Sequence, residues 1–132
     1  MCLLDHVATW DAEHITCTAT SHRSDSNPLR AYDRLSSVCG IEYAAQAMAI
    51  HGALIAGLHD DRAPKAGYLT SVREVELFVP RLDDIQADLE VMAERMAGDG
   101  NNVLYRFSVR EPTRVLLTGR ASVRLDASGA QP

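Results

Sequence analysis

The chain is built around the stretch Val38–Leu58, whose sequence is VCGIEYAAQAMAIHGALIAGL. As a helix this stretch would span about 30 Å at the usual rise per residue. Its Ala, Gly, Ile, Leu and Met residues occupy every side of such a helix rather than one stripe, which is typical of a helix enclosed by other elements. Because Glu42, Gln46 and His51 interrupt the apolar run, we predict a buried core helix rather than a membrane span.

One carboxylate, Glu42, falls in the first turn of the predicted helix. Burying an unpaired carboxylate costs free energy because its charge loses water, so Glu42 is a candidate functional residue. The alternative is structural, since an acid in the first turn is also favoured by the helix dipole. His51 lies on the opposite helical face at 100° per residue, and we interpret it as a core histidine with satisfied hydrogen bonds.

Length and composition indicate one globular domain. With 132 residues, of which 46% are hydrophobic, we expect a single domain over residues 1–125 and a flexible C-terminal tail over 126–132. The net charge of −5 argues against nucleic acid or an anionic membrane as partner. Three cysteines without a CxxC pair predict neither a disulfide framework nor a metal site, and they favour a cytoplasmic location. The apolar start, Met1–Leu4, is too short for a signal peptide.

Extended segments flank the helix on both sides. Alternating apolar and polar residues, with many β-branched side chains, predict strands before the helix and a meander of three or four strands after it. A long polar loop, Ser21–Ser37, joins the early strands to the helix. This order predicts an α+β hot-dog fold, in which a curved antiparallel sheet wraps one central helix over about 38–58. The predicted strands are Cys2–Thr9, His14–Thr20, Tyr68–Pro80, Ile85–Glu94, Val103–Val109 and Val115–Leu125.

The helix start carries a recognisable pattern. Gly40–Gln46, with the sequence GIEYAAQ, resembles the helix signature of the 3-hydroxyacyl-acyl-carrier-protein dehydratases, in which an acid opens the central helix and Gln follows four residues later. The loop sequences Ser21–Arg23 (SHR) and Asn27–Arg30 (NPLR), together with Gly40–Ala49, are similar to the ApeP-like branch of that superfamily, which is associated with aryl polyene biosynthesis. The resemblance covers nearly the whole chain.

The chain also departs from the general dehydratase pattern. Ser21–Arg23 stands where that pattern has Gly-His-Phe-Pro, and Ser36 and Ser37 replace the Pro-Gly that precedes the helix. The separation between the loop histidine and the helix acid is longer as well.

The resemblance implies a dehydratase that removes water from 3-hydroxyacyl thioesters on an acyl carrier protein, giving trans-2-enoyl thioesters. It implies His22 as the base and Glu42 as the acid, with dry surroundings keeping Glu42 protonated. Because the family's pair comes from two protomers, it implies a homodimer or a heterodimer with a second dehydratase subunit. It implies no cofactor beyond the phosphopantetheine arm of the carrier protein.

Five further residues are candidates for substrate binding. Backbone N–H groups at the helix start, including those of Val38 and Gly40, are expected to hold the thioester carbonyl. Gln46 shares a helical face with Glu42 and with small residues along which an acyl chain could run. Arg23 and Arg30 are expected to meet the phosphate of the carrier arm or an acidic carrier protein, unless they are merely solvated loop charges.

Two other functions remain open on the sequence. A hot-dog acyl thioesterase would use the helix acid to activate water and would not need the loop histidine. A non-catalytic subunit of a heterodimeric dehydratase would need neither residue for chemistry, and the altered loop motif leaves that option open.

Overall fold

The computed structural model describes residues 2–59, 66–99 and 101–126. Of the predicted tail over 126–132, only Asp126 falls within these ranges, where it ends the last strand. The elements, in chain order, are β1 (His6–Trp10), β2 (His14–Ala19), the 3-10 turns η1 (Ser21–Arg23) and η2 (Ser37–Cys39), α1 (Gly40–His59), β3 (Ala66–Leu77), β4 (Leu89–Gly98), β5 (Asn102–Glu111) and β6 (Arg114–Asp126).

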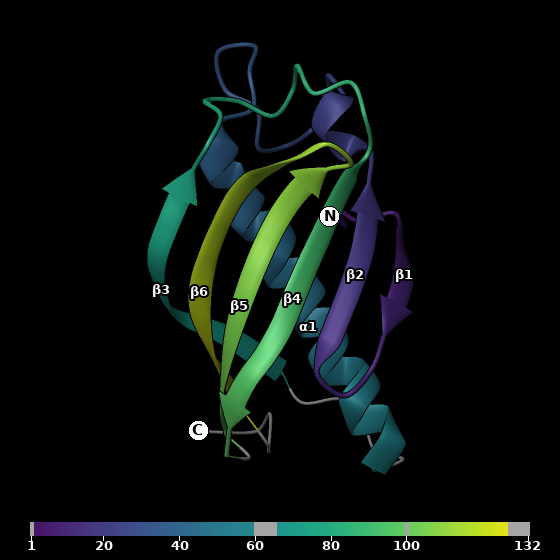
Figure 1. The fold of residues 1–132 in the computed structure, drawn as a ribbon, viewed down its shortest axis with the longest axis vertical. Coiled ribbons are helices and arrows are strands. Elements are labelled where there is room, and N and C mark those ends of the chain that lie inside the picture. Colours follow the sequence, from purple (N-terminus) through teal and green to yellow (C-terminus); the bar gives the residue numbers. More distant parts are fainter. Residues whose placement is uncertain (1, 60–65, 100, 127–132) are drawn as a thin grey trace.

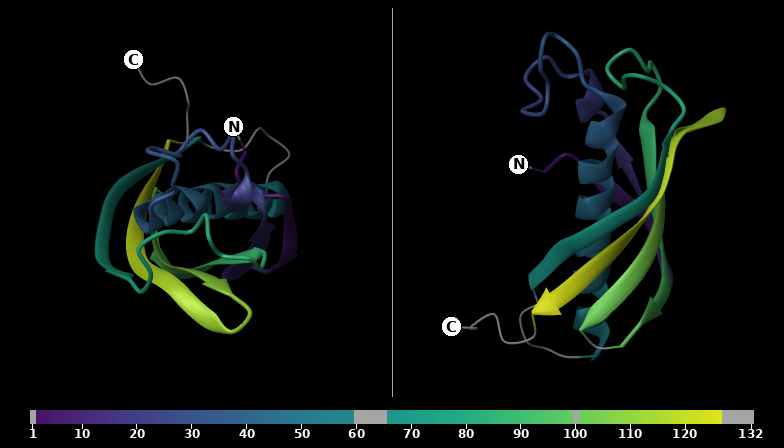
Figure 2. Two further views of the ribbon diagram at one scale, coloured as in Figure 1. Left: turned by 90° about the horizontal axis from the view of Figure 1, so that it is seen from above. Right: turned by 90° about the vertical axis from the view of Figure 1, so that its left-hand side faces the viewer.

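The strands form one antiparallel sheet in the order β1-β2-β4-β5-β6-β3. The helix α1 lies along one face of this sheet (Figure 1). The sheet curves around it, as the view from above shows (Figure 2, left). The predicted α+β hot-dog architecture is therefore confirmed. The chain crosses from the helix to β3, so that β3 forms one edge of the sheet and β1 the other.

The core lies between α1 and the concave face of the sheet. Side chains along β2, β4 and β5 alternate between buried and more exposed, as expected for strands that bury one face. From the helix, Tyr43, Ala44, Ala47 and Met48 fill this space. The strands contribute most of the other buried residues, which include Ile15, Cys17, Ala19, Leu89, Val91, Ala93, Tyr105, Phe107, Val109, Leu117 and Ala121. Segments outside the strands and the helix add Leu3, Leu4, Leu35, Leu82 and Ile85.

The predicted strand Cys2–Thr9 is found at His6–Trp10, and two further boundary differences bear on the candidate site. The helix begins at Gly40 rather than Val38, because a 3-10 turn capped by Ser36 occupies the preceding three residues. The alternating run from Ile85 to Glu94 is a strand only from Leu89 onward. The irregular segment Ile85–Asp88 therefore carries backbone carbonyls that no sheet partner uses.

The prediction that the helix is enclosed on every side is wrong for the single chain. Tyr43, Ala47 and His51 are buried against the sheet, whereas Glu42 and Ala49 on another face are exposed. One curved sheet can cover only part of a helix circumference. Composition shows that the whole helix is apolar, but it does not show which element covers each side.

Residues Ser37–Gly57 have the length and mean hydropathy of a membrane-crossing helix. This is weak evidence for a membrane span, because the core helix of a globular protein satisfies the same criterion. In this fold the helix contributes fully buried side chains, among them Tyr43 and Ala44, to the core against the sheet.

Candidate active site

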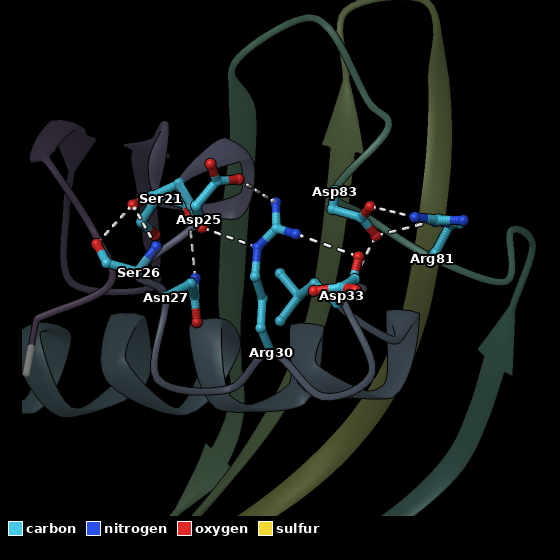
Figure 3. Close-up of polar contacts among 10 residues, drawn as sticks. Ser21, Asp25, Ser26, Asn27, Arg30, Asp33, Arg81 and Asp83 are labelled. Atoms are coloured by element: carbon cyan, nitrogen blue, oxygen red, sulfur yellow. Dashed lines mark hydrogen bonds and ion pairs between the residues drawn. The ribbon is translucent and has the colours of Figure 1, made fainter.

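The long polar loop between β2 and α1 is an ordered structure organised around Arg30 (Figure 3). The Arg30 Nε donates to the backbone oxygen of Ser24 over 2.8 Å, and Nη1 donates to the backbone oxygen of Asp33 over 3.3 Å. Nη2 lies 3.8 Å from the Asp25 carboxylate. The guanidinium group, predicted to meet a substrate phosphate, is therefore engaged by the loop itself.

A second arginine ties this loop to the segment after β3. Arg81 forms a two-pronged ion pair with Asp83 (Figure 3). The same carboxylate accepts the backbone N–H of Leu35 over 2.9 Å. Arg81 and this N–H hold the pKa of Asp83 well below its usual range, because they stabilise the charged carboxylate. Asp83 thus stays ionised and anchors the loop beside the helix start.

His22 lies in the 3-10 turn η1 and is completely buried. Its Nε2 lies 3.0 Å from the backbone oxygen of Ile85 and 3.0 Å from that of Ala87, both in the irregular segment before β4. Its Nδ1 is buried as well and has no hydrogen-bond partner. A buried polar atom without a partner is uncommon in folded proteins and calls for an explanation.

The surroundings of His22 determine where its proton resides. Carbonyl oxygens only accept hydrogen bonds, so Nε2 carries the hydrogen and Nδ1 of the neutral ring carries a lone pair. Burial lowers the pKa of His22 below its ordinary value, and this effect exceeds the opposing one of the two carbonyl contacts. At neutral pH the imidazole is therefore uncharged, with Nδ1 as a buried basic nitrogen.

A buried hydrogen-bond network joins the turn that carries His22 to the helix that carries Glu42. The hydroxyl of Tyr43 lies 2.7 Å from Ser21 Oγ and accepts from Asn27 Nδ2 over 3.0 Å. Ser21 Oγ donates to the backbone oxygen of Leu3 over 2.7 Å. His22 follows Ser21 and Glu42 precedes Tyr43, so this network links the immediate neighbours of both candidate catalytic residues.

The structure places Glu42 on the open side of α1, where the side chain is exposed. The prediction that Glu42 lies in dry surroundings is wrong for the single chain. Successive helical residues point about 100° apart, so Tyr43 can face the core while Glu42 faces outward. Nε2 of His22 contacts two backbone carbonyls and Nδ1 has no hydrogen-bond partner, so neither ring nitrogen bonds to Glu42. The single chain therefore does not assemble the predicted acid–base pair.

The expected free N–H groups at the helix start are largely occupied. Val38 N–H donates to Ser36 Oγ over 3.3 Å, and Gly40 N–H donates back to carbonyls of the preceding turn. That premise of the carbonyl-binding prediction is wrong, because the 3-10 turn uses these donors. Gly40 has a packing role as well, since a Cβ atom there would lie 2.5 Å from a methyl carbon of Leu117.

The remaining predicted binding residues also contact the protein itself. Gln46 Oε1 accepts the backbone N–H of Leu3 over 2.7 Å, which fastens the N-terminal segment to α1. Arg23 donates to the backbone oxygen of Gln86 over 2.6 Å and pairs with Asp88 at 3.0 Å. Direct contact of either side chain with a substrate stays a prediction.

His51 is a satisfied core histidine, as predicted. The ring is fully buried, its Nε2 donates to the backbone oxygen of Asp11 over 2.7 Å, and its Nδ1 accepts from the Tyr105 hydroxyl over 2.8 Å. The two rings also meet edge to face at 5.6 Å. Burial lowers the pKa of His51 and raises that of Tyr105 to about 12. Within the described residues, no group of His, Cys, Asp and Glu side chains is arranged to hold a metal ion.

Sequence reasoning missed the partners that position His22. One local signal was available: Asn27 precedes proline, and its Oδ1 accepts the backbone N–H of Leu29 over 2.9 Å in an Asx turn. The contacts to Tyr43, Ile85 and Ala87 span 16, 63 and 65 positions in the chain. No local pattern encodes contacts between residues so far apart.

Comparison with solved structures identifies the fold. The dehydratase heterocomplex ApeI:P from Xenorhabdus doucetiae superposes with a TM-score of 0.84 at 22% identity, covering 94% of this chain and 82% of that one. A thioesterase from Haemophilus influenzae gives 0.65 at 11% identity, covering 91% and 76%. A thioesterase superfamily member from Mus musculus gives 0.62 at 9%, covering 91% and 80%. At these identities the likeness demonstrates the shared fold alone.

Sequence comparison is more specific. No curated protein matches the chain. The family model of the ApeP-like proteins, described as ApeP dehydratase, matches residues 1–128. That range includes the His22 turn, the polar loop, the whole of α1 and all six strands. The chain therefore belongs to the ApeP-like dehydratase family.

Proposed function

We propose that the chain is a subunit of a dehydratase that removes water from 3-hydroxyacyl thioesters on an acyl carrier protein, giving trans-2-enoyl thioesters. His22 acts as the base through Nδ1, and Glu42 acts as the acid. The setting is aryl polyene or fatty-acid-like biosynthesis in the cytoplasm, and the three free cysteines fit a reducing compartment. The substrate needs no cofactor beyond its phosphopantetheine arm.

The observation that carries the proposal is the state of His22. A base must be unprotonated at the working pH and must have a lone pair that the protein does not use. His22 meets both requirements, because burial lowers its pKa and Nδ1 has no partner. The two carbonyls on Nε2 leave the hydrogen there, so the same tautomer is maintained before and after each turnover.

The exposure of Glu42 supports a second subunit as part of the site. Large apolar side chains are exposed in the single chain, with Val38 49% and Phe78 56% accessible, and the outer edge of β3 has no partner strand among the described residues. Exposed apolar residues beside an open sheet edge favour association with another chain. A subunit covering this face would exclude water from around Glu42, which disfavours the charged carboxylate.

We infer that this subunit is a second dehydratase, because the structurally similar ApeI:P protein is a dehydratase heterocomplex. The acid and base of one site would then come from different chains. The alternative is that a second copy of this chain covers the Glu42 face. The mass of the native complex distinguishes the heterodimer from the homodimer.

The reaction balances with water as the only molecule released. Nδ1 of His22 takes the proton from the α-carbon, and the electron pair of that bond forms the new double bond. The bond between the β-carbon and its oxygen breaks, and the Glu42 carboxyl protonates the departing hydroxide. Proton exchange with water then resets both groups. Each group is expected to contribute about 10²–10⁴-fold to the rate.

One observation favours a second candidate function. Nδ1 of His22 is closed off in the single chain, so substrate reaches it only when covering groups move. A chain that stabilised an active partner, without performing chemistry, would not need that access. A non-catalytic subunit is therefore the main alternative to a catalytic dehydratase subunit.

The test combines the chain with its second subunit and supplies a 3-hydroxyacyl carrier-protein substrate, followed by mass spectrometry. We expect loss of water from the acyl group. The variant Glu42→Gln, which removes the proton with little change of shape, should lower the rate about 10²-fold or more. The matched control Glu13→Gln changes an exposed acid near the β1–β2 turn and should leave the rate unchanged.

Each other outcome identifies a rival. Release of free carrier protein would indicate a thioesterase. A complex that stays fully active with both Glu42→Gln and His22→Gln in this chain would identify a non-catalytic subunit and refute the proposed chemistry.

A further inference from the structure

We propose that Tyr43 is a positioning residue for His22: its buried hydroxyl holds the Ser21–Arg23 turn so that the His22 imidazole keeps Nδ1 as its free basic nitrogen. The proposal rests on the proposed function for its catalytic meaning. Its structural part concerns the imidazole alone and can be tested without turnover.

Every hydrogen in the network around Tyr43 is assigned by its partners. Ser21 Oγ must donate to Leu3, because a backbone carbonyl only accepts. Ser21 Oγ therefore accepts from the Tyr43 hydroxyl, which itself accepts from the Asn27 amide. The Asn27 amide also donates to the backbone oxygen of Ser21 over 2.9 Å. A single phenol thus couples the helix, the N-terminal segment, the polar loop and the His22 turn.

The opposite side of the same turn is fastened to the segment before β4. The side chains of His22 and Arg23 contact the backbone carbonyls of three consecutive residues, 85–87. His22 Nε2 contacts the oxygens of Ile85 and Ala87, and Arg23 Nη1 donates to the oxygen of Gln86 between them. The turn is therefore held from two sides, with Tyr43 supplying the hold on the side of α1.

Two charged groups act on the His22 ring. Arg23, on its own turn, lowers the pKa of His22, and Asp88, just before β4, raises it. These two effects on the pKa oppose each other, and burial, which lowers the pKa, is the largest cause of the shift. A change that loosens the turn admits water to the ring and weakens the effect of burial. The pKa of His22 should then rise toward its ordinary value of 6.5.

The test is Tyr43→Phe, which keeps the ring that packs in the core and removes only the hydroxyl. Nitrogen NMR of the full-length chain follows the tautomer and titration of His22. In the parent protein Nδ1 should give the signal of an unprotonated ring nitrogen at neutral pH. In Tyr43→Phe the two tautomers should mix and the pKa should rise. With the second subunit present, kcat should fall about tenfold with little change in KM, as for one lost orienting hydrogen bond.

Tyr105→Phe is the matched control. It removes a buried hydroxyl that bonds to the other buried histidine, at 2.8 Å from His51 Nδ1. It should change the NMR signals of His51 and leave those of His22 unchanged. The pH at which the dehydration rate falls in acid should also stay the same. Ser21→Ala deletes the same contact from the other partner. Its effect on His22 should add only in part to that of Tyr43→Phe, because both variants remove the Ser21–Tyr43 hydrogen bond, and each also removes one further bond, that to Leu3 or that from Asn27.

A His22 titration in Tyr43→Phe that superimposes on that of the parent protein overturns the proposal. Equal losses of rate in Tyr43→Phe and Tyr105→Phe, in proportion to their losses of stability, overturn it as well. If the parent complex shows no dehydration but the His22 titration moves as described, the proposed function fails and the positioning role of Tyr43 stands.

Discussion

The two buried histidines of this protein occupy similar surroundings but use their ring nitrogens differently. His51, inside α1, donates from Nε2 to a backbone carbonyl and accepts at Nδ1 from a tyrosine. His22, in the turn before the polar loop, bonds two carbonyls through Nε2 and leaves Nδ1 without a partner. Burial lowers the pKa of both rings.

The difference separates a structural histidine from a candidate catalytic one. A ring with both nitrogens paired contributes to stability and has no lone pair to offer a substrate. A ring with one unpaired buried nitrogen makes one hydrogen bond fewer than it could. The lone pair on that nitrogen is available to take a proton from a substrate. The same substitution should therefore mainly lower the catalytic rate at His22 and mainly lower the free energy of unfolding at His51.

The largest expected effect is on catalysis, in the variant His22→Gln. The glutamine amide can still donate toward the Ile85 or Ala87 carbonyl, but it has no basic nitrogen. The kcat/KM for dehydration by the complex should fall about 10²–10⁴-fold, while the free energy of unfolding changes by less than about 1 kcal/mol. His51→Gln is the control and should keep the rate within a few-fold. A comparable loss of rate at both positions would remove the distinction between the two histidines.

The next effect concerns how closely the helix start approaches the sheet. A Cβ at Gly40 would lie 2.5 Å from Leu117, whereas nothing lies within 4 Å of one at Gly52. Gly40→Ala should lower the free energy of unfolding by about 1–3 kcal/mol through overpacking. Gly52→Ala should raise it by up to about 1 kcal/mol, because alanine favours the helix. Denaturant unfolding of the isolated chain measures both, and equal changes would contradict the tight contact at Gly40.

The loss of stability in His51→Gln should be similar to that in Gly40→Ala or smaller. His51→Gln leaves the buried Tyr105 hydroxyl without its acceptor, so the free energy of unfolding should fall by about 1–3 kcal/mol. The double variant with Tyr105→Phe should recover part of that loss, since the unsatisfied hydroxyl is gone. Denaturant titrations of the single and double variants provide the measurement. Failure to recover any stability would contradict the hydrogen-bond explanation.

The smallest expected effect is a loss of stability in mild acid. Both histidines have pKa values below the ordinary 6.5 when folded, so the unfolded chain binds protons more readily. Their contribution is therefore complete above pH 6.5 and is lost as pH falls toward the folded values. Between pH 6.5 and 5.5 the loss is at most about 1.4 kcal/mol for each histidine. Unfolding curves at several pH values test this, and the double variant with both histidines changed to Gln should show a flatter dependence.

Local pattern was sufficient for the architecture. Alternation along the strands, the apolar length of the helix and the polar loop between them predicted the wrapped helix, because burial of one strand face and of a helix follows periodicity. The separation of His51 from Glu42 on the helix likewise predicted that His51 is a core residue, and its two hydrogen bonds confirm this. The acid and histidine of the candidate site were also visible as sequence motifs.

What the sequence by itself determined is therefore the set of elements, since these depend on neighbouring positions, whereas His22 and Glu42 as catalytic residues stay a prediction from its motifs. Only the tertiary structure decided that Nδ1 of His22 is the free nitrogen, that Tyr43 fastens its turn and that Glu42 faces outward. The physical reason is range: these properties depend on carbonyls, hydroxyls and covering surfaces brought together by folding from distant parts of the chain, and periodicity carries no record of such contacts.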